Sequence, residues 1–217
     1  MSAATAELAE IVAGLNKPEK MISPKYFYDE RGSQLFEAIT RLPEYYPTDT
    51  ELGIMQDNMA EITTLVGPQA SLIEFGSGSS HKTRALLENL KELAVYVPVD
   101  ISEDHLNVAA DKIRSEFPDL EVLPVVADFT KPFALPSPPI MPLRNIVFFP
   151  GSTIGNFTHA TEKELLGVMH QEAGEDGALL IGVDLQKDPD IIERAYNDSA
   201  GLTEKFNLNM LRHLNRE

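Results

Sequence analysis

The sequence predicts an α/β fold: a doubly wound, mostly parallel β-sheet preceded by a helical segment. Three observations carry this prediction. From residue 70 onward, short apolar runs recur along the chain, and most of them are separated by stretches with helical spacing of apolar residues. The runs are apolar throughout, without the alternation of a half-exposed strand, which is typical of parallel strands covered on both faces.

Each element follows from its local pattern. Residues 49–66 have apolar side chains at helical spacing, and Gly67 and Pro68 end that pattern. The first fifteen residues carry Glu7 and Glu10 where a signal peptide has basic residues, so we expect an amphipathic helix there. The proline-rich stretch 132–142 is expected to be a loop. The expected strands are 71–75, 95–99, 122–126, 145–149 and 178–183, and the expected helices are 81–93, 102–117, 161–173, 190–196 and 202–215.

This pattern divides the chain into residues 1–67, 68–187 and 188–217. A doubly wound sheet usually has strands after the fifth, and none is expected beyond residue 184. We therefore expect that the natural protein continues past Glu217.

Composition excludes several classes of function. The formal net charge is −16, from 34 acidic and 18 basic residues, which repels a phosphate backbone and disfavours nucleic acid as a partner. No apolar run reaches about 18 residues, so no membrane span is expected. The absence of cysteine excludes disulfides and thiol chemistry, and the five histidines show no metal-ligand spacing. The expected location is the cytosol, the expected metal content is none, and the oligomeric state is not predicted.

A glycine-rich turn follows the first expected strand. Gly76, Ser77 and Gly78 allow a tight turn and close backbone approach to a ligand. A dinucleotide fingerprint needs a third glycine where His81 stands, whereas the acid Glu74, two residues before the first glycine, is the form found in Rossmann-like methyltransferases that bind S-adenosylmethionine. The alternative is a bare strand-to-helix turn.

Two further acids follow the next strands. Asp100 ends the second strand, roughly 20 residues beyond the glycines, where an acid hydrogen-bonds ribose hydroxyls. Asp128 and Phe129 follow the third strand, where a carboxylate can accept from the adenine amine and a ring can cover the base. Alternatively, Asp100 is only a neighbour of the helix cap Ser102, and Asp128 alone indicates little. In order and at this spacing, the three sites favour a nucleoside ligand.

Three longer motifs carry a family resemblance: KYFYDERGS at 25–33, RLPEYYPT at 41–48 and GSTIGN at 151–156. With the residues above, they resemble the histidine-specific, S-adenosylmethionine-dependent methyltransferases of ergothioneine biosynthesis, which make hercynine. The resemblance runs from about Pro24 to Glu217 and implies a class I methyltransferase fold. The chain departs from the family at Gly151 and Ser152, where a double glycine is common, and it ends within the family's substrate domain.

The resemblance also implies site residues. The first part, 1–67, would contribute to the substrate pocket, 68–187 would bind the cofactor, and 188–217 would begin a substrate-binding domain. Tyr45 and Asn156 would be the catalytic pair, and together with Tyr196 they would hold the α-amino and α-carboxylate groups of the amino acid. Tyr28 would face the imidazole. The expected cofactor residues are Gly76, Ser77, Gly78, Lys82, Asp100, Asp128 and Phe129, together with Glu74 from the turn motif. The implied substrate residues are Tyr28, Phe36, Tyr45, Gly151, Asn156 and Tyr196.

The residues leave other interpretations open. The aromatic side chains at 26–28 and Phe36 are also typical of plain core packing, Asn156 of a turn, and Lys82 of a solvated lysine in the first turn of a helix. The chain could also act on another amino acid, such as a prenylated indole amino acid, or be an inactive S-adenosylmethionine-binding fragment. In a methyl transfer to an amine, the amine must be neutral when it attacks, and no strong general base is needed.

Overall fold

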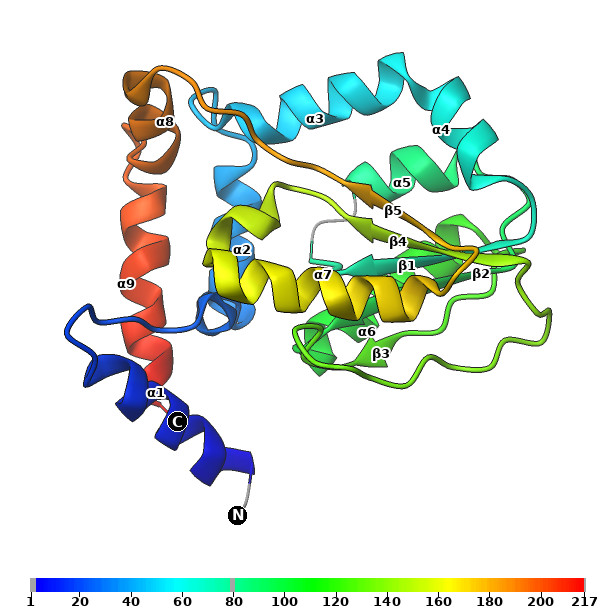
Figure 1. Cartoon of the computed structure of the whole chain (residues 1–217). Helices are drawn as coiled ribbons and strands as arrows, with labels where there is room; N and C mark the ends of the chain where they lie inside the picture. The colour runs from blue at the N-terminus through cyan, green and yellow to red at the C-terminus, as the bar shows by residue number, and fades with distance from the viewer. Residues whose placement is uncertain (1–2, 79–80, 217) are drawn as a thin grey trace. The chain divides into compact units, whose positions relative to one another are not determined.

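The computed structural model describes residues 3–78 and 81–216 (Figure 1). Contacts divide the chain into two compact units, one made of Met1–Tyr45 and Pro189–Glu217 and the other of Tyr46–Asp188. The predicted functional boundaries at residues 67 and 187 stay a prediction. In terms of contacts, the helical residues 46–66 belong with the sheet, although they precede the predicted boundary at residue 67.

The unit Tyr46–Asp188 is built on a parallel sheet, as the sequence predicts. Its strands run in the order β3-β2-β1-β4-β5, and every pairing among them is parallel. The order reverses between β1 and β4, which is the switch point of a doubly wound sheet. The strands are β1 (Ala70–Phe75), β2 (Val95–Asp100), β3 (Val125–Val126), β4 (Arg144–Phe149) and β5 (Ala178–Ile181).

The third strand is shorter than predicted. Residues 122–126 were expected to pair throughout, but Val122 forms an isolated bridge with Tyr96 and regular pairing resumes only at Val125. Pro124 lies between them, and because proline has no N–H it interrupts a ladder of hydrogen bonds.

Helices cover both faces of this sheet (Figure 1). One face packs against α3 (Tyr46–Asp57), α4 (Met59–Val66), α5 (His81–Leu87) and α6 (Glu103–Glu116), and the other packs against α7 (His159–Ala173). Neighbouring side chains of a strand alternate between the faces, so Leu72 packs with the first group and Ile73 with the second. The expected helix at 49–66 is two helices that break at Asn58, and the stretch 132–142 has no regular structure, as predicted.

The unit Met1–Tyr45 and Pro189–Glu217 is helical. Helix α2 packs along α9, although they lie at opposite ends of the chain. Asp29 caps α2 by accepting the Gly32 N–H at 2.7 Å, and it also accepts the amide of Asn209 on α9 at 2.6 Å. One side chain therefore joins the two helices. The elements are α1 (Ala3–Leu15), the 3-10 helix η1 (Pro24–Phe27), α2 (Glu30–Ile39), α8 (Pro189–Tyr196) and α9 (Leu202–Leu214).

None of the helices formed by residues 3–78 and 81–216 combines the length and the apolar character needed to cross a bilayer.

Candidate functional site

The glycine turn leaves open space at the end of β1. Gly76 has a φ of +77°, a conformation that favours glycine, and its N–H donates to the Val99 carbonyl at 2.8 Å. A Cβ added at Gly78 would meet no atom of the described residues within 4 Å. Of the motif, Ser79 and Ser80 lie outside the described residues. The turn thus offers the close backbone approach that the sequence motif predicts.

Ser77 presents an unusual hydroxyl in this turn. Its residue is 3% exposed, and its Oγ is buried without a hydrogen-bond partner in the described structure. Buried polar atoms are nearly always hydrogen-bonded, because an unmade bond leaves their desolvation uncompensated. An unpaired hydroxyl beside the open space at Gly78 fits a site that takes a polar ligand.

Asp100 ends β2 and is largely buried. Its Oδ1 accepts the Ser102 N–H at 3.0 Å, so the carboxylate does contribute to the local turn before α6. An ionised carboxylate accepts at both oxygens, and this bond uses only part of that capacity. Burial raises the pKa of Asp100 above its ordinary value, although the Ser102 N–H opposes this effect.

Asp128 lies two residues after β3, and its carboxylate is held locally. Its Oδ1 accepts the N–H and the hydroxyl of Thr130, at 3.1 and 2.5 Å, and its Oδ2 pairs with Lys131 at 3.0 Å. Desolvation opposes ionisation, but the bonds to Thr130 and Lys131 prevail and lower the pKa of Asp128. The carboxylate is therefore ionised and oriented at neutral pH.

Phe129 covers the glycine turn. A Cβ added at Gly76 would lie 3.5 Å from the Phe129 ring. The ring also packs near Phe75 and Phe149, at centroid distances of 5.6 and 5.8 Å. These neighbours fix an apolar surface beside the turn.

Glu74 does not face the open space. It is 2% exposed and lies on the sheet face that packs against α5. The Thr83 hydroxyl lies 2.7 and 2.8 Å from its two oxygens, and the Tyr96 hydroxyl donates a short hydrogen bond to it. Burial raises the pKa of Glu74 to about 7. Its partners are side chains of α5 and β2, and its contact with a cofactor stays a prediction.

Lys82 is paired, which argues against the solvated interpretation. Its ammonium forms a short ion pair with Glu51 of α3. The two Glu51 oxygens also accept the Gly151 N–H, at 3.0 and 2.8 Å. Glu51 thereby connects one predicted cofactor residue with one predicted substrate residue, and the sequence analysis did not find it.

Gly151 and Asn156 follow β4. Gly151 has a φ of +83° and Ser152 a φ of +54°, so the chain turns sharply after the strand. The Ser152 hydroxyl accepts the Asp184 N–H at 2.9 Å, which ties this turn to the segment after β5. Asn156 ends the 3-10 helix η2 (Thr153–Asn156) and is exposed.

Four predicted substrate residues form an aromatic cluster in the helical unit. The ring centroids of Tyr28 and Phe36 are 5.6 Å apart, those of Phe36 and Tyr45 are 6.1 Å apart, and those of Tyr45 and Tyr196 are 5.8 Å apart. Phe206 of α9 joins them, 5.6 Å from Tyr28, and was not predicted. Tyr45 is 7% exposed and Tyr196 51% exposed. The rings pack together, and their role toward a substrate stays a prediction.

Sheet topology brings the predicted cofactor residues to one edge. In an open α/β sheet, ligands bind outside the carboxyl ends of the strands near the switch point. Four predicted residues follow the carboxyl ends of neighbouring parallel strands, namely Gly76 after β1, Asp100 at the end of β2, Asp128 after β3 and Gly151 after β4.

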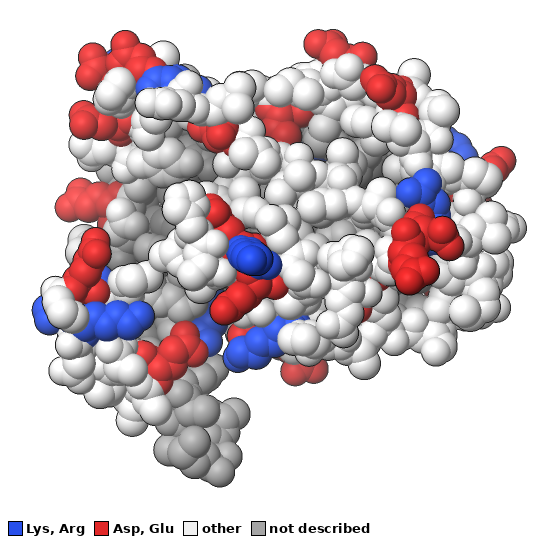
Figure 2. Space-filling model, in the orientation of Figure 1, with Lys and Arg blue, Asp and Glu red and all other residues white. Residues whose placement is uncertain are grey.

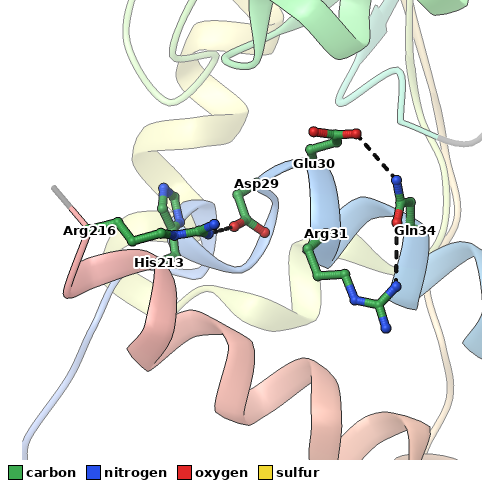
Figure 3. A pocket seen from close by; sticks show the side chains of 6 residues that line it. All are labelled: Asp29, Glu30, Arg31, Gln34, His213 and Arg216. Atoms are coloured by element: carbon green, nitrogen blue, oxygen red, sulfur yellow. Dashed lines mark hydrogen bonds and ion pairs between the residues drawn. The ribbon is translucent and has the colours of Figure 1, made fainter.

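A hollow of about 520 Å³ lies in the helical unit (Figure 3). Its polar side chains bind one another: Arg31 donates to Gln34, which donates to Glu30, and Arg216 pairs with Asp29. It includes none of the predicted site residues. Only the Arg216–Asp29 pair connects the start of α2 with the residues after α9, because the other two bonds lie within α2.

On the face shown in Figure 2, acidic side chains are interspersed with basic ones over the surface. Within residues 3–78 and 81–216, no three His, Asp or Glu side chains gather as metal ligands.

The chain is similar to known proteins over its whole length. The family profile "Histidine-specific methyltransferase, SAM-dependent" matches residues 7–217. A histidine N-alpha-methyltransferase of Mycolicibacterium smegmatis is 42% identical, with 100% of this chain and 67% of the relative covered. A protein of the same name from Mycobacterium tuberculosis is 40% identical, with 96% and 64% covered. The chain thus spans about two thirds of the length of these relatives.

A solved structure supports the fold. An O-methyltransferase family protein from Burkholderia thailandensis matches with a TM-score of 0.50 at 15% identity, covering 94% of this chain and 56% of that one.

Proposed function

Because the chain belongs to the histidine-specific, S-adenosylmethionine-dependent methyltransferase family, we propose that it binds S-adenosylmethionine and serves the N-methylation of the histidine α-amine, to the trimethylated product hercynine. The main support for cofactor binding is the glycine turn, where the Ser77 hydroxyl has no hydrogen-bond partner among the described residues and adjoins space at Gly78 that none of them fills. The acceptor half is supported by relatives that are named for histidine and are 42% and 40% identical.

Each cofactor residue has a role that its surroundings support. The Gly76–Gly78 backbone and the Ser77 hydroxyl would bind the amino-acid end of the ligand. Asp100 would accept from the ribose hydroxyls and Asp128 from the adenine amine, with Phe129 against the base. Glu74 would act through Thr83 and Tyr96, by holding α5 and β2 against the turn.

The acceptor requires orientation more than a strong base. Bound S-adenosylmethionine supplies a methyl group on a sulfonium, which is open to in-line attack. The attacking amine must be neutral, and a free α-amino group has a pKa of about 8, so a usable neutral fraction exists near neutral pH. The protein's task is to position that amine and to exclude water.

Asn156 and Tyr45 would bind the α-amino and α-carboxylate groups of the substrate. The Asn156 amide would accept from the amine and donate to the carboxylate. Tyr45 would accept a further N–H and, through its ring, stabilise the methylated cation by about 0.5–2 kcal/mol. Tyr196 would assist with the carboxylate, Phe36 and Gly151 would line the pocket, and Tyr28 would face the imidazole.

Calorimetry and an acceptor screen test this function. We expect the 217-residue chain to bind S-adenosylmethionine and S-adenosylhomocysteine without added metal. Mass spectrometry of reactions with histidine, tryptophan and a prenylated tryptophan should show methylated histidine. If only an indole amino acid is methylated, the proposed acceptor changes from histidine to that amino acid. The absence of cofactor binding would refute the proposal.

Replacing Gly78 by alanine gives a local prediction. The added Cβ meets no atom within 4 Å among residues 3–78 and 81–216, so we expect no clash with them in the folded state. A ligand in that space would meet the methyl group, and we expect about fivefold weaker S-adenosylhomocysteine binding. The midpoint temperature of thermal unfolding should stay unchanged or rise slightly, since alanine lowers the entropy of the unfolded chain. Unchanged affinity would place the ligand elsewhere.

A further inference from the structure

We propose that Glu51 is a positioning residue of the cofactor site, which acts by holding the Lys82 ammonium beside the turn at Gly151, where an added Cβ would lie 3.5 Å from Lys82 Nζ. The inference rests on the proposed function, because it takes Lys82, a predicted cofactor residue, as part of the site that binds S-adenosylmethionine. Glu51 lies on α3, outside the glycine turn and the acids that follow the strands.

The contacts of Glu51 are made by three segments of the same unit. Its carboxylate pairs with Lys82 at the start of α5 and accepts the Gly151 N–H after β4 with both oxygens, at 3.0 and 2.8 Å. A surface ion pair makes one such contact and contributes little. Here the Lys82 and Glu51 side chains are only 13% and 17% exposed.

A third segment is shaped to receive this carboxylate. A Cβ added at Gly182, just after β5, would lie 1.8 Å from Glu51 Oε1. Gly182 is itself held in place, since its N–H donates to the Phe149 carbonyl at 3.0 Å. The absence of a side chain at Gly182 therefore gives Glu51 the room to reach Gly151 and Lys82.

Lys82 needs this partner because of where it lies. It occupies the first turn of α5, where the exposed N–H groups of a helix disfavour a cation. At 13% exposure the ammonium is also largely removed from water. Without the Glu51 charge, the flexible lysine stem would carry the ammonium toward solvent and away from the turn.

The direct test is Glu51→Gln in the 217-residue chain, with S-adenosylhomocysteine affinity measured by calorimetry. Glutamine keeps the size and can still accept the Gly151 N–H, but it lacks the charge that pairs with Lys82. We expect about tenfold weaker binding. Unchanged affinity would contradict the proposal, and so would tighter binding, because that would mean Glu51 competes with the ligand for Lys82.

Two further variants separate positioning from general loss of stability. Glu116→Gln removes a different ion pair of α5, because Glu116 on α6 pairs with Arg84 on α5 at 2.6 Å. The affinity of this variant for S-adenosylhomocysteine should match the wild type. Gly182→Ala keeps Glu51 but displaces its carboxylate, so its affinity should fall as in Glu51→Gln. Gly182→Ala also tests the proposal if Glu51→Gln fails to fold.

A double-mutant cycle identifies the route of the effect. Lys82→Met alone should weaken binding, and adding Glu51→Gln to it should cost less than a further twofold. Additive losses would show that Glu51 does not act through Lys82, which overturns the inference while leaving the proposed function in place. A wild-type chain that binds no cofactor would overturn both.

Discussion

Asp100→Asn is expected to weaken S-adenosylmethionine binding about a hundredfold while the fold is retained. In the proposed site the carboxylate accepts from two ribose hydroxyls, and hydrogen bonds to charged groups contribute about 1.5–3 kcal/mol each. Asparagine has one accepting oxygen, and its amide offers donors where a second acceptor is needed. Loss of one such bond, with mispairing at the other position, corresponds to about 2.7 kcal/mol.

The substitution separates the ligand role from the turn role. Asp100 Oδ1 accepts the Ser102 N–H at 3.0 Å, and the asparagine oxygen can keep that bond. Urea unfolding of the ligand-free variant should therefore stay close to the wild type, while calorimetry shows the loss of affinity. Asp111→Asn is a matched control, because Asp111 is 74% exposed and pairs with Arg114 on α6. Equal affinity of Asp100→Asn and wild type would reduce Asp100 to a residue of the turn.

Much of the fold could be predicted because its signals are local. Apolar runs of strand length with helices between them indicate a parallel sheet wherever they occur, and the strands after residue 70 appear where expected. The error at 122–126 arises from a single residue, Pro124, whose missing N–H outweighs the apolar pattern around it. The break at Asn58 was missed because apolar spacing continues through it.

The site was predictable to the extent that it follows strand ends. Gly76, Asp100 and Asp128 each come after a strand, and parallel topology then places them at one edge of the sheet. Glu51 was not predictable in this way, because its partners Lys82 and Gly151 lie 31 and 100 positions away. Phe206 likewise joins the aromatic cluster only because α9 packs along α2.

Glu74 shows how strand alternation decides a role. Its position two residues before the glycines predicts a place in the cofactor site, and in the structure it shares a face with Leu72 and accepts from Thr83 of α5. Alternation along β1 was available in the sequence, and the missing information was which face α5 covers. Thr83 and Tyr96, its partners, become relevant only once that face is known.

Glu74→Gln should change how stability depends on pH. Burial raises the pKa of Glu74 from its ordinary value of 4.5 to about 7 in the folded protein. The folded state therefore holds the proton over a range where the unfolded chain has lost it. As pH rises from about 4.5 to 7, Glu74 makes folding progressively less favourable, by about 3 kcal/mol in total. Glutamine does not titrate, so the variant lacks this loss.

The difference between the two proteins isolates the effect. Asp29, Asp128, Asp184 and Asp198 have lowered pKa values, which makes folding more favourable as pH rises, so the wild-type curve alone mixes opposing contributions. These contributions cancel when wild type is compared with Glu74→Gln by urea unfolding from pH 4.5 to 8. The variant should gain relative stability up to about pH 7 and no further above it, with the exposed Glu88→Gln as a control for the substitution itself. A constant difference would mean that the Thr83 and Tyr96 hydroxyls compensate the burial of the charge in full, and that Glu74 is ionised in the folded protein well below pH 7.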